Sequence, residues 1–190
     1  MDGSELADLS GLGVDLRALR RSRGATLTAL AAELNRSVGW LSQVERGLSD
    51  PSIDDLRRIA AIFGVPVSFF FRNDDAPEGE RGHVVRADHR RSLGNAVAGL
   101  TEELLSPDIG GAFETLRCTF APGAQLKTAQ QRDTEEAGYI VSGTLDLWIG
   151  DTVFHLGPGD SFRLNGEPYR WYNPGSIPAI VIWTIAPPVY

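Results

Sequence analysis

The chain has 190 residues, of which 42% are hydrophobic and 23% are charged, a composition typical of a folded protein rather than a disordered one. No apolar run approaches the roughly 20 residues of a membrane-spanning helix, and the acidic start lacks the apolar stretch of a secretion signal. Cys118 is the only cysteine, which excludes an intramolecular disulfide. We therefore expect a cytoplasmic protein with no membrane association, and the length suits two domains.

The net charge of −7 is unevenly distributed along the chain. Residues 14–72 carry nine arginines and six acidic residues, whereas the rest of the chain carries nine basic and nineteen acidic residues. A locally basic segment is compatible with DNA binding, because salt confines its electrostatic field to about 8 Å. The acidic net charge therefore does not exclude a nucleic-acid-binding protein.

The N-terminal part of the chain has a helical period. We expect residues 1–12 to form a loose arm and residues 13–72 to form a helical domain. Apolar residues recur at helical spacing from Val14 to Phe71, and start and stop signals divide this region into about five helices.

Capping residues locate the central helices of this region. Thr26 is a candidate N-cap for one helix, and Ser37 is a candidate N-cap for the next, which ends at Gly47. Ser52, with Asp55 three positions later, has the pattern of a capping box at the start of a further helix. Two short helices separated by a few residues form the geometry that places the second one in the major groove of DNA.

Three short runs in this region resemble the phage-repressor, or XRE family, type of helix-turn-helix. They are Thr-Leu-Thr-Ala-Leu-Ala over residues 26–31, Leu-Ser-Gln-Val-Glu-Arg-Gly over residues 41–47, and Pro-Ser-Ile over residues 51–53. The resemblance covers residues 14–71. It implies a sequence-specific DNA-binding transcriptional regulator whose recognition helix runs from Ser37 to Arg46.

The faces of this helix separate core positions from DNA-facing ones. Val38, Leu41 and Val44 share one face and are predicted to be core, and Glu45 is predicted to pair with a nearby arginine. The opposite face is expected to meet double-stranded DNA. Together with flanking positions, the candidate DNA-binding residues are Thr28, Arg36, Ser37, Gly39, Trp40, Ser42, Gln43 and Arg46.

These candidates differ in the contact that each is expected to make. Gln43 is able to bind adenine through two hydrogen bonds, worth roughly 1–3 kcal/mol of discrimination, and the alternative is a solvated surface side chain. Trp40 either meets thymine methyl groups or the sugar-phosphate edge, or it is a half-buried residue at the edge of the core. Arg36 and Arg46 are predicted to contact phosphates rather than bases.

The C-terminal part of the chain has a different period. Residues 73–82 are polar and lack apolar anchors, which is typical of a linker. From residue 83 onward, short alternating segments between glycine and proline turns predict about nine strands, enough to close a small antiparallel barrel.

The turns of residues 83–190 resemble those of the cupin family. The first cupin motif, with two histidines, a glutamate and a glycine, falls on Gln130, Arg132, Glu136 and Gly143, and the second falls on Gly159, Tyr169 and Asn173. The resemblance implies an antiparallel double-stranded β-helix, or cupin barrel, acting as a sensor domain. The predicted fold class is therefore multidomain α + β, with a five-helix DNA-binding domain followed by this barrel.

Three of the four positions that hold the metal in metal-binding cupins carry other residues here, namely Gln130, Arg132 and Tyr169. A guanidinium repels a cation, and Glu136 alone does not hold a transition metal against water. His83, His89 and His155 fall off the ligand positions. We therefore expect no metal, no cofactor and no catalytic residues. The alternative is a metal-dependent cupin enzyme with a DNA-binding appendage.

A barrel interior without a metal is predicted to bind a small-molecule effector. The candidate effector-binding residues are Gln130, Arg132, Glu136, Phe162, Tyr169 and Trp171. A carboxylate beside aromatic rings favours an amine, whereas Arg132 favours an amino acid or a small carboxylate. In the alternative interpretation Arg132 and Glu136 pair with each other, and the barrel is only a dimerisation platform. We expect a homodimer on a near-palindromic operator, with the effector changing DNA affinity.

Overall fold

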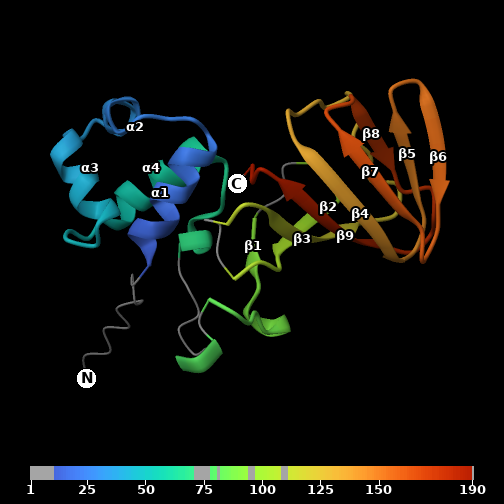
Figure 1. The fold of residues 1–190 in the computed structure, drawn as a ribbon, viewed down its shortest axis with the longest axis horizontal. Coiled ribbons are helices and arrows are strands. Elements are labelled where there is room, and N and C mark those ends of the chain that lie inside the picture. Colours follow the sequence, from blue (N-terminus) through green and yellow to red (C-terminus); the bar gives the residue numbers. More distant parts are fainter. Residues whose placement is uncertain (1–10, 71–77, 81, 94–96, 108–110, 190) are drawn as a thin grey trace. The chain divides into compact units, whose positions relative to one another are not determined.

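The computed structural model describes residues 11–70, 78–80, 82–93, 97–107 and 111–189 (Figure 1). The chain forms two compact units, one of the described residues up to Arg91 together with Pro107, and one of Ser92–Ser106 and Gly111–Val189. Most of the expected N-terminal arm, as well as residues 73–77 and 81 of the expected linker, lies outside the described residues. Within the described ranges, no helix is long and apolar enough to cross a membrane.

The first unit contains four α-helices among its described residues, labelled in Figure 1: α1 (Leu12–Ser22), α2 (Leu27–Glu33), α3 (Val38–Glu45) and α4 (Ile53–Phe63). The prediction of five helices is wrong, because the last apolar segment forms only the short 3₁₀ helix Val67–Phe70. Pro66 precedes this segment directly, and a single four-residue turn is too short to propagate as an α-helix. Phe69 and Phe70 nevertheless join the core of the unit.

The predicted caps are confirmed. The Thr26 hydroxyl accepts a hydrogen bond from the Ala29 amide at 3.1 Å, and the Ser37 hydroxyl accepts one from the Trp40 amide at 3.1 Å. At the start of α4, Ser52 and Asp55 form a reciprocal capping box. These caps satisfy amide groups that the first turn of each helix leaves without partners, so they define where α2, α3 and α4 begin.

Nine strands are described in the remainder of the chain: β1 (Arg91–Ser92), β2 (Leu100–Leu104), β3 (Glu114–Phe120), β4 (Glu135–Ser142), β5 (Leu145–Ile149), β6 (Thr152–Leu156), β7 (Ser161–Asn165), β8 (Tyr169–Tyr172) and β9 (Ala179–Ala186). One sheet has the order β1-β2-β3-β9-β4-β7, and the other has the order β6-β5-β8 (Figure 1). From β2 to β9, the ladders between the described strands are antiparallel.

The prediction of a closed barrel is wrong, because no ladder among the described strands joins the two sheets. Outside the ladders, the described pairing is limited to isolated bridges, such as the one between Gln130 and Tyr169. The inner faces of the two sheets supply a shared core that includes Leu116, Val181 and Leu147, all at most 1% exposed. Strict alternation of burial along β3 and β9 produces this face, as expected for strands with one side against a core.

The candidate DNA interface and the interior of the β-sandwich

The recognition-helix candidates lie on α3 and its flanks, with Thr28 on α2. Thr28, Arg36, Ser37, Gly39, Gln43 and Arg46 are exposed, and Trp40 and Ser42 are half-buried. Gln43 lies on the solvent side of α3, opposite Leu41 and Val44, which are 0% and 1% exposed. The helix and its flanks therefore present a mostly polar surface that includes Trp40.

The prediction that Val38 belongs to the core is wrong, since Val38 is 41% exposed. Val38 is the first residue of α3 and follows the capping residue Ser37. The buried side of the helix begins one turn later, at Leu41, so the valine side chain lies beyond the edge of the core. Helical period alone does not show where along a face the neighbouring helices stop covering it.

Arg36 is engaged within the domain. Its Nε and Nη2 atoms donate to the two carboxylate oxygens of Asp55 at 3.0 and 2.9 Å. The guanidinium carbon also lies 5.1 Å from the centre of the Trp40 ring, within the range of a cation–π interaction. Arg36 thus connects the start of α4 with the exposed surface of α3.

Asp55 receives hydrogen bonds from two sources. Burial raises the pKa of its carboxyl, but hydrogen bonds from Ser52 and Arg36 outweigh burial, and the pKa lies below its usual value. The carboxylate of Asp55 accepts from the Ser52 amide at 3.2 Å and from its hydroxyl at 2.7 Å. The ionised form is therefore the one that the fold stabilises.

Glu45 has the structural role expected for it. Its carboxylate accepts two hydrogen bonds from Arg20 of α1, at 2.6 and 2.9 Å, and both side chains are at most 10% exposed. Gly13 allows this approach of α1 to α3, because a Cβ there would lie 2.3 Å from the carbonyl oxygen of Val44. Arg46, by contrast, is exposed, and its Nε donates to the Ser42 carbonyl of its own helix at 3.1 Å.

The centre of the second unit contains a buried carboxylate, Glu136 of β4, which is 2% exposed. One oxygen accepts from the Thr134 hydroxyl at 2.8 Å, and the other accepts from the indole Nε1 of Trp183 at 2.7 Å. The nearest guanidinium nitrogen of Arg132 is 3.9 Å away. The structure therefore brings Glu136 and Arg132 together at the outer limit of an ion pair.

Trp183 of β9 is the residue around which the predicted aromatic positions gather. Its ring lies 4.8 Å from that of Phe162 and 5.7 Å from that of Tyr169, between ring centres. Gly138 leaves room for Phe162, since a Cβ at that glycine would lie 2.1 Å from the phenyl ring. Trp171 packs edge-on against Phe120, with 4.6 Å between the ring centres.

Two further observations describe the Tyr169 side of the cluster. Gln130 exchanges two backbone hydrogen bonds of 2.8 Å with Tyr169, which fixes the segment before β4 against β8. Burial raises the pKa of the Tyr169 phenol; Arg132 lowers it, and Glu136 raises it further. The phenol is therefore a neutral hydrogen-bonding group at physiological pH.

Sequence reasoning missed Trp183 and Thr134 as partners of Glu136. The alternation along residues 179–186 does place Trp183 on the buried side with Val181 and Ile185. The pairing of the indole with a carboxylate 47 positions earlier follows only from the register of β4 against β9, which sets Gly138 opposite Trp183. This register is a long-range property.

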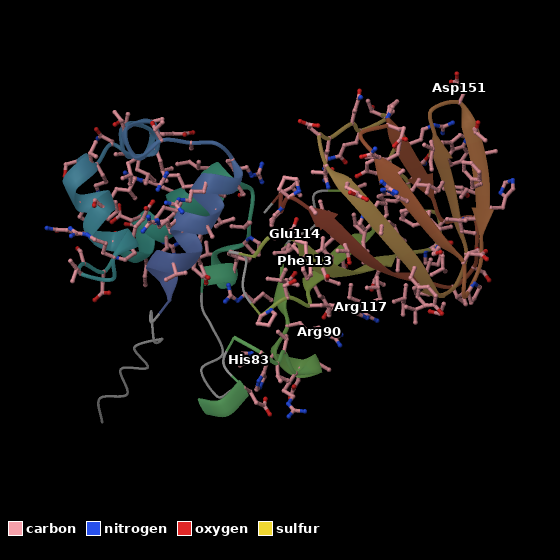
Figure 2. The ribbon with its side chains drawn as sticks, in the orientation of Figure 1. His83, Arg90, Phe113, Glu114, Arg117 and Asp151 are labelled. Atoms are coloured by element: carbon pink, nitrogen blue, oxygen red, sulfur yellow. The ribbon has the colours of Figure 1, made fainter. Side chains whose placement is uncertain are left out.

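The cupin metal site does not fit the residues present here. Gln130, Arg132 and Tyr169 supply an amide, a cation and a neutral phenol where imidazoles would be needed. Over the described part of the chain, no group of three or more His, Cys, Asp or Glu side chains is placed to hold a metal ion. His83 lies in an exposed turn before β1 (Figure 2).

Comparison with known proteins supports both domain assignments. Residues 12–68 match the helix-turn-helix domain family, and residues 116–185 match the cupin domain family. The HTH-type transcriptional regulator PuuR of Escherichia coli is 25% identical over 85% of this chain and 86% of its own length. SutR, an HTH-type transcriptional regulator of the same organism, is 27% identical over 86% of this chain and 87% of its own.

A crystal structure of an HTH_3 family transcriptional regulator from Vibrio cholerae is 24% identical, with a TM-score of 0.43, and covers 95% of this chain and 97% of that one. The two family matches and the near full-length relatives agree with the capped helix pair and the two-sheet unit described above. This chain is therefore a DNA-binding transcriptional regulator that joins a helix-turn-helix domain to a cupin domain.

Proposed function

We propose that this regulator binds a small amine-bearing effector inside its cupin domain, without a metal and without catalysis, and that binding changes its affinity for DNA. The observation that carries the proposal is the placement of Glu136. A carboxylate that is 2% exposed lies against an indole, in a cluster that also contains Tyr169 and Phe162.

The charge of this interior supports a cationic ligand. Glu102, Glu114 and Glu136 are all buried on the inner side of the larger sheet, whereas Arg132 is 22% exposed in its side chain. An ammonium group would be attracted both to such a carboxylate and to the faces of nearby aromatic rings.

One observation favours the alternative of a purely structural platform. Both oxygens of Glu136 already accept hydrogen bonds, from Thr134 and Trp183. In that case Glu136 would order the sandwich and recognise nothing. The two interpretations predict different behaviour for Glu136→Gln, which keeps the volume of the side chain and removes its charge.

A thermal-shift screen of the full chain separates them. Amines, amino acids and small carboxylates are added to the wild type, to Glu136→Gln and to Glu135→Gln, a neighbouring control whose side chain is 59% exposed. A ligand at 100 times its Kd adds about 2.7 kcal/mol of stability. We expect an amine to stabilise the wild type and the control but not Glu136→Gln. Equal stabilisation of all three, or of none, would contradict the proposal.

We further propose that the protein is a homodimer that reads a near-palindromic operator. Two recognition helices then enter successive major grooves about one helical turn apart. Sedimentation measurements on the full chain give its mass, and selection from random DNA duplexes gives its site. A monomer in solution that recovers a single half-site would contradict this arrangement.

A further inference from the structure

Gly39 lies inside α3, although neither its backbone conformation nor its packing requires a glycine. Its φ angle is not among the positive ones, so its conformation does not require glycine. A Cβ added there would have only the Ser37 hydroxyl within 4 Å among the described residues, at 4.0 Å. Glycine in a helix costs about 0.5–1 kcal/mol relative to alanine, so this position is less stable than the domain alone requires.

Gly13 shows what a packing requirement looks like in the same domain. A Cβ there would lie 2.3 Å from the Val44 carbonyl oxygen, so the contact between α1 and α3 excludes any side chain. The bare surface at Gly39 faces open space instead. Such a surface serves the close approach of something outside the domain.

Val38 stands directly before Gly39 and exposes 41% of its surface at the start of α3. The first turn of a recognition helix is the part that contacts base edges in the major groove. Among the four bases, only thymine presents a methyl group there, and apolar side chains recognise it by contact. Val38 offers two methyl groups at this end of the helix, and Gly39 leaves the space beside them free.

We propose that Val38 reads a thymine 5-methyl group in the operator and that Gly39 allows the helix to approach the base edge closely enough for this contact. The inference rests on the proposed function of α3 as the recognition helix. It adds Val38 to the base-reading residues, because its side chain supplies apolar surface that Gln43 does not.

The test uses the duplex that the full chain selects from a random library, with each thymine replaced in turn by deoxyuridine, which lacks the methyl group. We expect one such replacement per half-site to weaken binding by the wild type about fourfold, the value for one buried methyl-sized group. Val38→Ala should bind the thymine and deoxyuridine duplexes equally. Val14→Ala, the same deletion at an exposed position of α1, should keep the wild-type sensitivity.

Gly39→Ala gives an independent readout. We expect this variant to melt roughly 4 °C higher than the wild type, because alanine favours the helix. It should also bind the selected duplex roughly tenfold more weakly, because the added methyl group is forced into a packed interface. A glycine with only a structural role would not combine greater stability with weaker binding.

The possible outcomes separate this inference from the proposed function. If no duplex is enriched, α3 is not a recognition helix and both fail. If a duplex is enriched but no deoxyuridine replacement weakens wild-type binding, or if Val38→Ala retains the sensitivity, the thymine contact alone is refuted.

Discussion

Replacing Arg36 with alanine separates two roles for this side chain. The sequence suggests a phosphate contact, whereas the structure gives its guanidinium to Asp55 through bonds of 3.0 and 2.9 Å and places it beside Trp40. We expect the structural role to dominate, so that Arg36→Ala weakens the helical domain and changes specific binding through the position of Trp40.

The magnitude follows from the burial of the two partners. The side chain of Asp55 is 4% exposed, but that of Arg36 is 44% exposed, so water screens part of the attraction. Ser52 continues to donate to Asp55 after the change. We therefore expect a loss of about 1–2 kcal/mol, below the roughly 3–5 kcal/mol of a fully buried pair. For a domain of this size, Tm falls by roughly 4–8 °C per kcal/mol.

The assay measures DNA affinity at several salt concentrations for Arg36→Ala and for Arg46→Ala. Arg46 is exposed, and its Nε donates to the Ser42 carbonyl one turn earlier. Loss of a phosphate contact reduces the slope of log K against log salt by about 0.9. We expect this reduction for Arg46→Ala and a nearly unchanged slope for Arg36→Ala. A slope reduced by 0.9 with an unchanged Tm in Arg36→Ala would refute the reasoning.

Three further predictions concern the helical domain. Glu45→Ala leaves the buried Arg20 guanidinium without its carboxylate, so urea unfolding should show a loss of about 3–5 kcal/mol in the free energy of unfolding. Replacing Glu45 by leucine and Arg20 by methionine together should recover most of this loss. Equal stability of the single and double variants would exclude a buried ion pair. Gln43→Ala should lose operator selectivity in competition binding while non-specific affinity is retained; an unchanged selected consensus would show that Gln43 reads no base. The pKa of Asp55 is lower in the folded protein than in the unfolded chain, where it is near 3.9. The ionised carboxylate therefore stabilises the fold above that pH, and this stabilisation is lost as the pH falls through the pKa of the folded state. Asp55→Asn should therefore make the stability of this domain depend less on pH in acid, and identical acid transitions for both proteins would contradict that linkage.

Features that depend on neighbouring residues were predictable from the sequence. The caps at Thr26, Ser37 and Ser52 act on amides three positions away, and the structure has them where the pattern predicts. The alternation of the strands is equally local. These short-range rules located the helix pair and predicted about nine strands, the number found among the described residues.

Features that depend on distant residues were not predictable in the same way. The barrel does not close, because sheet closure depends on pairing between strands far apart in sequence. The partner of Glu136 is Trp183, 47 positions away, and the partner of Glu45 is Arg20, 25 positions away. Sequence reasoning expected an arginine for Glu45 but did not identify it. Val38 was misassigned because its exposure depends on where the neighbouring helices end.

The central claim is that ligand binding in the cupin domain changes DNA affinity. Its most direct test is the Kd of the full chain for the selected duplex, measured with and without the amine that emerges from the thermal-shift screen. Coupling of this kind typically changes Kd by roughly 5–150-fold, and we predict such a change in the wild type and Glu135→Gln but not in Glu136→Gln. A ligand that stabilises the protein and leaves its Kd for DNA unchanged would contradict the claim.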